Sequence, residues 1–162
     1  MTSVNQRPRP PAGDLPLHFA VLMDLAWRGF RRRLDEGVGP RVAGTRTADG
    51  SPLRPSHVRL LSLTPVVGMR LSDLAARVGM TKQALGEFVA ALQGAGLLEV
   101  TVDERDRRVR LVRPTPAGRE LQAFVESAIA GIERRWAAEV GPERWATFRE
   151  VLTRIGETGS GS

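Results

Sequence analysis

A short run of polar and small residues at the start of one predicted helix carries groups that can contact DNA bases. Gly79 marks a tight turn between two short helical patterns, and a helix-turn-helix presents the first turns of its second helix to the major groove. The outward residues of that second helix are Thr81, Lys82, Gln83, Gly86 and Glu87. The Gln83 amide can pair with adenine through two hydrogen bonds, and Lys82 can meet guanine or a phosphate. The alternative is an ordinary helical hairpin whose polar residues face solvent.

A second candidate contact lies in the charged segment that follows this helix. Residues 103–108 read DERDRR, between two short runs that alternate apolar and polar residues and therefore predict a β-hairpin. Its candidate DNA contacts are Arg105, Arg107, Arg108 and Arg110. Arginines at the tip of a rigid ribbon suit a narrow minor groove, where negative potential is concentrated. Asp103 and Asp106 can pair with arginines and brace the tip. The alternative is a solvated charged face.

Composition excludes several other kinds of chemistry. The chain has 162 residues, of which 41% are hydrophobic and 26% charged, as is typical of one globular core. It has 24 basic and 18 acidic residues, and the net charge of +6 favours a polyanionic partner. Cysteine is absent, and the two histidines, His18 and His57, lie far apart, so we expect no metal, no cofactor and no catalytic site. No apolar run approaches the roughly 18 residues that cross a membrane, and we predict a cytoplasmic protein.

The elements that would position these residues follow from periodicity and from helix-breaking residues. Residues 14–36 predict a helix that is apolar around more than half its circumference, and the glycines and prolines of residues 37–54 predict a long loop. Residues 55–114 predict a helix-turn-helix with a β-hairpin wing. Residues 115–158 predict two helices that Gly141 and Pro142 separate. We expect a disordered basic arm at residues 1–13 and a flexible tail at residues 159–162.

Five short motifs, taken in order, resemble those of the MarR family of bacterial winged-helix regulators. They are LSDLAARVG at residues 71–79, TKQA at 81–84, GLL at 96–98, DERDRR at 103–108 and TPAG at 115–118. The resemblance implies a mainly α fold with a small β-hairpin wing, flanked by N- and C-terminal dimerisation helices. It also implies that the recognition helix begins at Thr81, and that Arg107 or Arg108 enters the minor groove while Asp106 braces the wing.

The chain departs from the family pattern at three places. Arg54 stands where a helix-capping threonine is common, and Gly86 and Glu87 replace the more usual small or basic residues of the reading face. Residues 37–53 form a longer connection than usual. Members of the family often bind aromatic or phenolic acids, so His18, Trp27 and His57 are candidate lining for an effector pocket. The alternative for these three residues is ordinary core packing.

The sequence therefore predicts a homodimer that binds a palindromic operator in double-stranded DNA. We expect a repressor that a small aromatic or phenolic effector releases, with no membrane partner. The alternative is a winged-helix module that docks another protein and binds DNA weakly or secondarily. An enzyme is not expected, because no nucleophile-base pair, phosphate loop or carboxylate dyad stands at chemical spacing.

Overall fold

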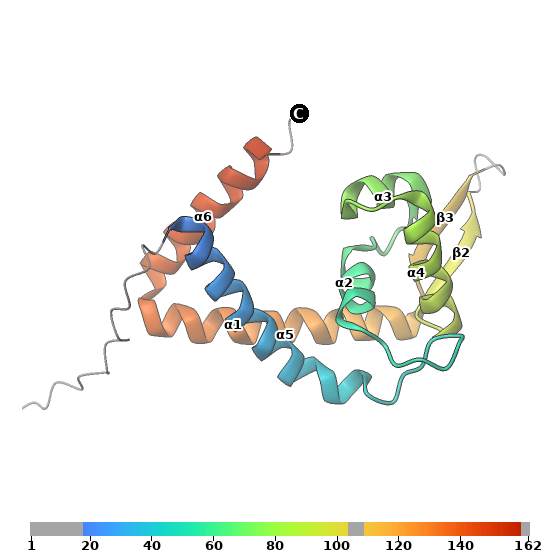
Figure 1. Ribbon diagram of the computed structural model, residues 1–162, viewed down its shortest axis with the longest axis horizontal. Coiled ribbons are helices and arrows are strands. Elements are labelled where there is room, and N and C mark those ends of the chain that lie inside the picture. Colours follow the sequence, from blue (N-terminus) through green and yellow to red (C-terminus); the bar gives the residue numbers. More distant parts are fainter. Residues whose placement is uncertain (1–17, 104–108, 160–162) are drawn as a thin grey trace, which may run out of the picture.

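The computed structural model describes residues 18–103 and 109–159, and it is built from helices around a small sheet (Figure 1). The elements are α1 (Phe19–Val42), α2 (Pro55–Leu63), β1 (Met69–Arg70), α3 (Leu71–Val78), α4 (Lys82–Gly94), β2 (Leu98–Val102), β3 (Arg110–Pro114), α5 (Pro116–Val140) and α6 (Pro142–Gly159). This mainly α winged-helix architecture confirms the predicted fold class. None of the helices described is long and apolar enough to cross a bilayer.

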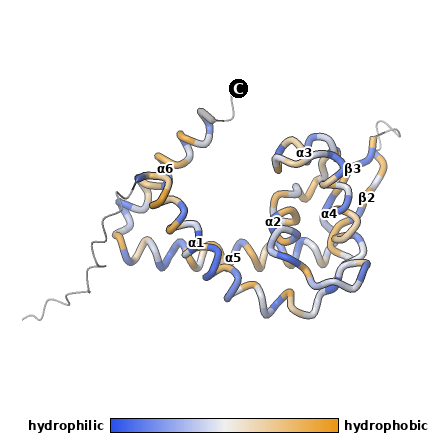
Figure 2. The backbone as a smooth tube through the Cα atoms, viewed as in Figure 1, coloured by the Kyte–Doolittle hydropathy of each residue, from blue (hydrophilic) through white to orange (hydrophobic). Residues whose placement is uncertain are grey.

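A compact lobe holds most of the core. It consists of α2, α3, α4 and the sheet, and α5 leads away from it to meet α1 and α6 at the far end (Figure 1). Leu61, Leu74, Leu85 and Leu92 are fully buried in this lobe, one or two from each of its helices. Hydrophobic segments also recur along α1 and α6, outside the lobe (Figure 2). This core continues onto the end of α1 and the start of α5 through Val38, Leu121 and Val125, while α6 and the remaining parts of α1 and α5 form a more open region.

The sheet contains a strand that the sequence analysis missed. Its order is β1-β3-β2, and all pairs are antiparallel. The predicted hairpin is present as β2 and β3, with Val100 opposite Val112. The additional strand, β1, pairs Met69 with Val112 and Arg70 with Leu111. Two residues are too few to show an alternating pattern, so sequence periodicity cannot reveal such a strand.

The first described helix extends beyond its predicted end. Residues 14–36 were expected to be helical and residues 37–54 a loop, but α1 continues to Val42. Val38 is buried in the core and Gly37 faces Ala128 of α5, so packing against the neighbouring helix outweighs the low helix propensity of the glycines. Pro40 lies two residues before the end of α1, and because it has no N–H it cannot donate the helical hydrogen bond to the Glu36 carbonyl. Residues 1–17 and 160–162, which include the predicted arm and most of the predicted tail, lie outside the described residues.

The TPAG motif forms a tight junction between the wing and α5. The Thr115 hydroxyl accepts a hydrogen bond from the Gly118 N–H at 3.0 Å and donates one to the Gly96 carbonyl at 2.6 Å. The Thr115 N–H donates to the Leu97 carbonyl at 3.1 Å. A Cβ added at Gly118 would lie 3.1 Å from the Leu97 carbonyl carbon and would overlap the oxygen. Glycine at position 118 therefore lets the first turn of α5 sit directly on the strand that follows α4.

Candidate nucleic-acid interface

The turn before α4 aims this helix through local backbone chemistry. Gly79 adopts the left-handed conformation, with φ 69° and ψ 36°, and its N–H bonds back to the end of α3. Thr81 then caps α4, because its hydroxyl accepts the Ala84 N–H at 3.2 Å. Leu74 and Leu85 are fully buried and fasten α3 and α4 to the lobe. The start of α4 is thereby fixed by two caps and a shared core.

The predicted reading residues share one accessible surface at the start of α4. Thr81, Lys82, Gln83 and Glu87 are exposed, and Gly86 is half-buried with no heavy atom within 4 Å of an added Cβ. The structure brings these five residues together on consecutive turns of one helix. Amide, ammonium and hydroxyl groups on that surface offer both hydrogen-bond donors and acceptors, and the open space at Gly86 permits close approach of a groove wall.

The structure describes the two strands of the wing and the residues next to them, up to residue 103 and from residue 109 onward. Pairing of β2 with β3 runs to Val102 opposite Arg110, and the Asp103 N–H extends it by donating to the Val109 carbonyl at 2.9 Å. Arg110 is exposed, whereas the guanidinium of Arg113 pairs with Glu99 at 2.8 Å across the strands. The end of β2 at Val102, the start of β3 at Arg110, and α3 lie on the side of the lobe away from α5 (Figure 1). The predicted contacts Arg105, Arg107 and Arg108 and the bracing residue Asp106 lie outside the described residues.

The three candidate pocket residues lie in two parts of the described structure. His18 is exposed at the start of α1, and Trp27, 51% exposed, stacks on Phe30 with ring centroids 5.5 Å apart. His57 lies instead in the lobe, where its ring meets Phe88 of α4 at 5.0 Å. The structure thus separates His57 from the other two and shows it packed against α4.

His57 also completes the N-terminus of α2. Its Nδ1 accepts the Arg54 backbone N–H at 3.0 Å, so the histidine satisfies a helix-end donor next to a residue, Arg54, that replaces the usual capping threonine. Burial, and then the positive charge of Arg54, lower the pKa of His57, while Asp49 opposes this effect. Neutral imidazole is the form that can accept this hydrogen bond.

An aromatic cluster joins α1, α5 and α6. Phe30 lies 6.0 Å from Trp136, Trp136 lies 5.6 Å from Trp145, and Trp145 lies 5.6 Å from Phe148, measured between ring centroids. The sequence placed each ring on an apolar helical stripe but could not show that rings from three helices meet. Within the described ranges, no group of three histidine, aspartate or glutamate side chains could hold a metal ion.

Comparison with curated proteins identifies two relatives that are transcriptional regulators. The chain is 33% identical over 130 residues to the HTH-type transcriptional regulator PetP of Rhodobacter capsulatus, covering 80% of this chain and 73% of PetP. It is 32% identical over 134 residues to the transcriptional activatory protein BadR of Rhodopseudomonas palustris, covering 80% of this chain and 69% of BadR. No protein-family model matches the chain.

Solved structures share the fold at lower sequence identity. A MarR-family regulator from Rhodococcus sp. RHA1 superposes with a TM-score of 0.64 at 20% identity, covering 84% of this chain and 90% of that one. CouR of Rhodococcus jostii RHA1 bound to p-coumaroyl-CoA superposes with a TM-score of 0.66 at 20% identity, covering 85% of this chain and 91% of CouR. The repressor CouR bound to a 23-mer DNA duplex superposes with a TM-score of 0.66 at 20% identity, covering 89% of this chain and 99% of that one. These likenesses concern the fold alone.

Proposed function

Because the chain belongs to the MarR family of winged-helix transcriptional regulators, we propose that it is a homodimeric repressor of a palindromic operator in double-stranded DNA. Its curated relatives are transcriptional regulators rather than enzymes. The observation that carries the proposal is the exposed polar first turn of α4, held rigidly beside the wing. A protein that acts on a bacterial genome works in the cytoplasm, where we place it.

Base reading is assigned to the start of α4. Gln83 pairs with an adenine in the major groove and Lys82 with a guanine or a neighbouring phosphate, while Thr81, Gly86 and Glu87 complete the reading face. The exposure of Gln83 and Lys82 supports this assignment, because neither side chain is used in the described packing of the lobe. CouR, which has the same fold, has been solved bound to DNA.

Minor-groove and backbone contacts are assigned to the wing. Arg105, Arg107, Arg108 and Arg110 contact DNA in this proposal, and Asp103 and Asp106 brace them. The pairing that continues from Val102 and Arg110 to Asp103 and Val109 supports it, because an ordered ladder at the base of the tip limits the entropy lost on binding. The contribution of the tip is mainly electrostatic and therefore depends on salt.

The dimer interface is assigned to α1, α5 and α6. Exposed hydrophobic side chains gather there, among them Phe19 at 66%, Leu25 at 51%, Val151 at 48% and Ile155 at 52% exposure. A concentration of exposed apolar side chains on neighbouring helices is typical of a protein interface. Two symmetric heads, about 34 Å apart along the DNA, supply the affinity that one helix and one wing lack. Light scattering should give the mass of two chains, and a monodisperse, folded single chain would exclude this assembly.

Release from the operator is assigned to a small aromatic or phenolic effector. An effector that binds one spacing of the two heads better than another shifts the dimer toward that spacing. The CouR neighbour solved with p-coumaroyl-CoA supports a ligand site in this fold, although the chemical class has to be argued from this chain.

The test of base reading compares Gln83→Ala with Gln93→Ala on an operator selected from genomic fragments. Gln83 lies at the start of α4, and Gln93 is an exposed glutamine near its end. Gln83→Ala should weaken operator binding by about 1 to 3 kcal/mol and leave binding to random DNA almost unchanged. Gln93→Ala should leave both unchanged. Equal behaviour of the two variants would remove Gln83 from the reading surface.

A second measurement tests the wing and the competing function. Arg107→Ala combined with Arg108→Ala should weaken operator and random DNA alike, and should reduce the salt dependence by about one unit of slope for each lost phosphate contact. Thermal melting first establishes that the double variant is folded. If this folded variant binds both DNAs with unchanged affinity and salt slope, the wing is a solvated hairpin. A module that docks another protein would then be the better description.

A further inference from the structure

An apolar groove of about 540 Å³ lies where α1, α5 and α6 meet, outside the DNA-binding lobe. Its wall on α1 runs from Leu25 to Arg33, which is about 12 Å along the helix axis. Three aromatic rings also line it: Trp136 of α5, and Trp145 and Phe148 of α6, with successive ring centroids 5.6 Å apart. The groove therefore presents a row of aromatic rings.

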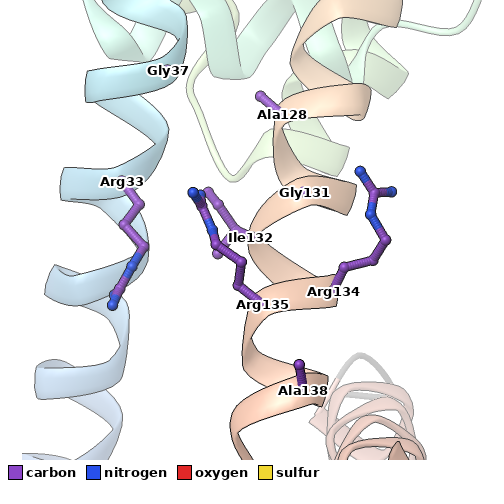
Figure 3. Close-up of a pocket in the computed structure, with 8 residues that line it drawn as sticks. All are labelled: Arg33, Gly37, Ala128, Gly131, Ile132, Arg134, Arg135 and Ala138. Atoms are coloured by element: carbon purple, nitrogen blue, oxygen red, sulfur yellow. The ribbon is translucent and has the colours of Figure 1, made fainter.

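The groove is accessible, and its rim is polar. Leu25 is 51% exposed and Phe148 is 41% exposed. Arg33 also lines a neighbouring hollow between α1 and α5 (Figure 3), which places it at one end of the groove. Its Cζ lies 5.9 Å from the centre of the Trp136 ring. The charged residues of the rim are Arg33, Glu139 and Arg144. A ligand that fits this groove needs an apolar surface that packs against aromatic rings.

The N-terminal segment of the chain has the composition that such a groove binds. Residues 7–11 read RPRPP, within the part of the chain that lies outside the described residues. Proline-rich segments favour the polyproline II helix and dock into grooves lined by aromatic side chains. This helix has three residues per turn, so Pro8 and Pro11 project from the same side of it, about 9 Å apart. Their spacing fits within the α1 wall of the groove.

The segment is also attached close to the groove. Helix α1 begins at Phe19, and the groove begins at Leu25, about 9 Å further along the helix. Seven peptide units join Pro11 to His18 and can span about 22 Å, which is enough to fold back to the groove. A short connection of this kind gives an effective concentration in the millimolar range, so that even an intrinsically weak contact is occupied.

We propose that residues 7–11 of the chain occupy this groove, with Pro8 and Pro11 packed against its row of aromatic rings. The contact between proline and aromatic rings supplies most of the binding, because the charges on the rim are of both signs. Of the four residues named above for the dimer interface, only Leu25 lines the groove, so the segment and a partner subunit occupy largely separate surfaces. The inference does not depend on DNA binding.

The experiment measures acrylamide quenching of tryptophan fluorescence in the full-length protein. All samples carry Trp27→Phe, so that only the two tryptophans of the groove emit. Pro8→Ala combined with Pro11→Ala should raise the quenching constant by about twofold or more, because the docked segment shields the rings. The matched control, Pro10→Ala combined with Pro16→Ala, removes two prolines from another side of the helix and should behave as the wild type. Equal quenching of the two double variants would overturn the proposal.

A synthetic peptide of residues 1–13 tests the groove directly. It should bind saturably to the variant that lacks Pro8 and Pro11, and about tenfold more weakly to the wild type, whose own segment competes with it. Adding Phe148→Ala to that variant should weaken peptide binding by about tenfold. Adding Phe124→Ala, which removes a similarly exposed ring from α5 outside the groove, should leave binding unchanged. The same Kd in the two phenylalanine variants would refute the groove as the site.

Dilution distinguishes the segment from a second copy of the chain as the occupant. Light scattering gives the mass of the assembly at each concentration. Quenching that depends on Pro8 and Pro11 at constant mass supports the proposal. Quenching that changes only when the mass changes, and equally in the wild type and the variant without these prolines, assigns the groove to a second copy and overturns it.

Discussion

Replacing Gly118 with alanine tests the junction that joins the wing to α5. The added Cβ would overlap the Leu97 carbonyl oxygen and would lie 3.2 Å from Pro114 Cβ, so the first turn of α5 must move away from the strand. Such overpacking costs about 1 to 3 kcal/mol. The movement also strains the bonds from the Thr115 N–H to Leu97 and from the Gly118 N–H to Thr115, at about 0.5 to 1.5 kcal/mol each.

Alanine also favours helix over glycine by up to about 1 kcal/mol, which offsets part of this cost. The expected net loss in the free energy of unfolding is about 1 to 6 kcal/mol, or a fall in Tm of roughly 2 to 24 °C for a chain of this size. Calorimetry at one fixed protein concentration measures it, because the melting temperature of a dimer such as the one we propose depends on protein concentration. Gly86→Ala is the control: nothing lies within 4 Å of its added Cβ, and it should be neutral or stabilising. A Gly118→Ala protein that melts at or above the wild-type temperature would refute the reasoning.

Three further substitutions probe the packing of the lobe. Gln122→Leu removes the buried Nε2 that donates to the Leu61 and Thr64 carbonyls at 2.6 and 2.8 Å, and should lower stability in urea by about 1 to 3 kcal/mol; an unchanged midpoint would contradict this role. The lowered pKa of His57 keeps its ring neutral in the folded state, so stability should be full above pH 6.5 and fall as the pH drops below that value; His57→Gln should flatten this profile while the control His18→Gln retains it. Gly94→Ala should displace the loop before α2, because its Cβ would come 2.7 Å from the Ala48 nitrogen, and wild-type melting would disprove that contact.

The element boundaries that the sequence predicts well are those set by local chemistry. Gly79 and Thr81 end one helix and start the next through their own backbone and hydroxyl groups, and Thr115 caps α5 in the same way. Gly141 and Pro142 separate α5 from α6. Each of these signals acts within a few residues, so no knowledge of the tertiary structure is needed to interpret it.

The boundaries that the sequence misses depend on distant partners. The last turns of α1 contain glycine and proline, yet Val38 is buried in the core and Gly37 meets α5. Strand β1 exists because β3, far along the chain, offers it a partner. Neither interaction leaves a periodic signal in its own segment.

The same difference between local and distant contacts decides which parts of the candidate site the sequence predicts. The exposed face of α4 follows from helical spacing alone, because its residues are neighbours in sequence. The three pocket candidates come from two elements, with His18 and Trp27 at α1 and His57 in α2, and spacing along the sequence cannot show how such elements lie in space. For the same reason the meeting of the Phe30, Trp136 and Trp145 rings has no sequence signal: each ring is ordinary within its own helix, and only the packing of α1 and α6 against α5 brings them together.

Because only one residue, Thr115, connects the wing to α5, we expect the wing and this helix to move together as one rigid unit. Strand β3 ends at Pro114 and α5 begins at Pro116. The hydroxyl and the N–H of Thr115, which lies between them, are both hydrogen-bonded, so little motion between strand and helix is possible. The 25 residues of α5 span about 37 Å at the rise of an α-helix. A tilt of about five degrees at one end of such a rod displaces the other end by about 3 Å, roughly one base-pair step. A displacement of the α6 end of α5 is therefore transmitted to the wing, and in the proposed complex it would shift the wing by about one base pair along the DNA.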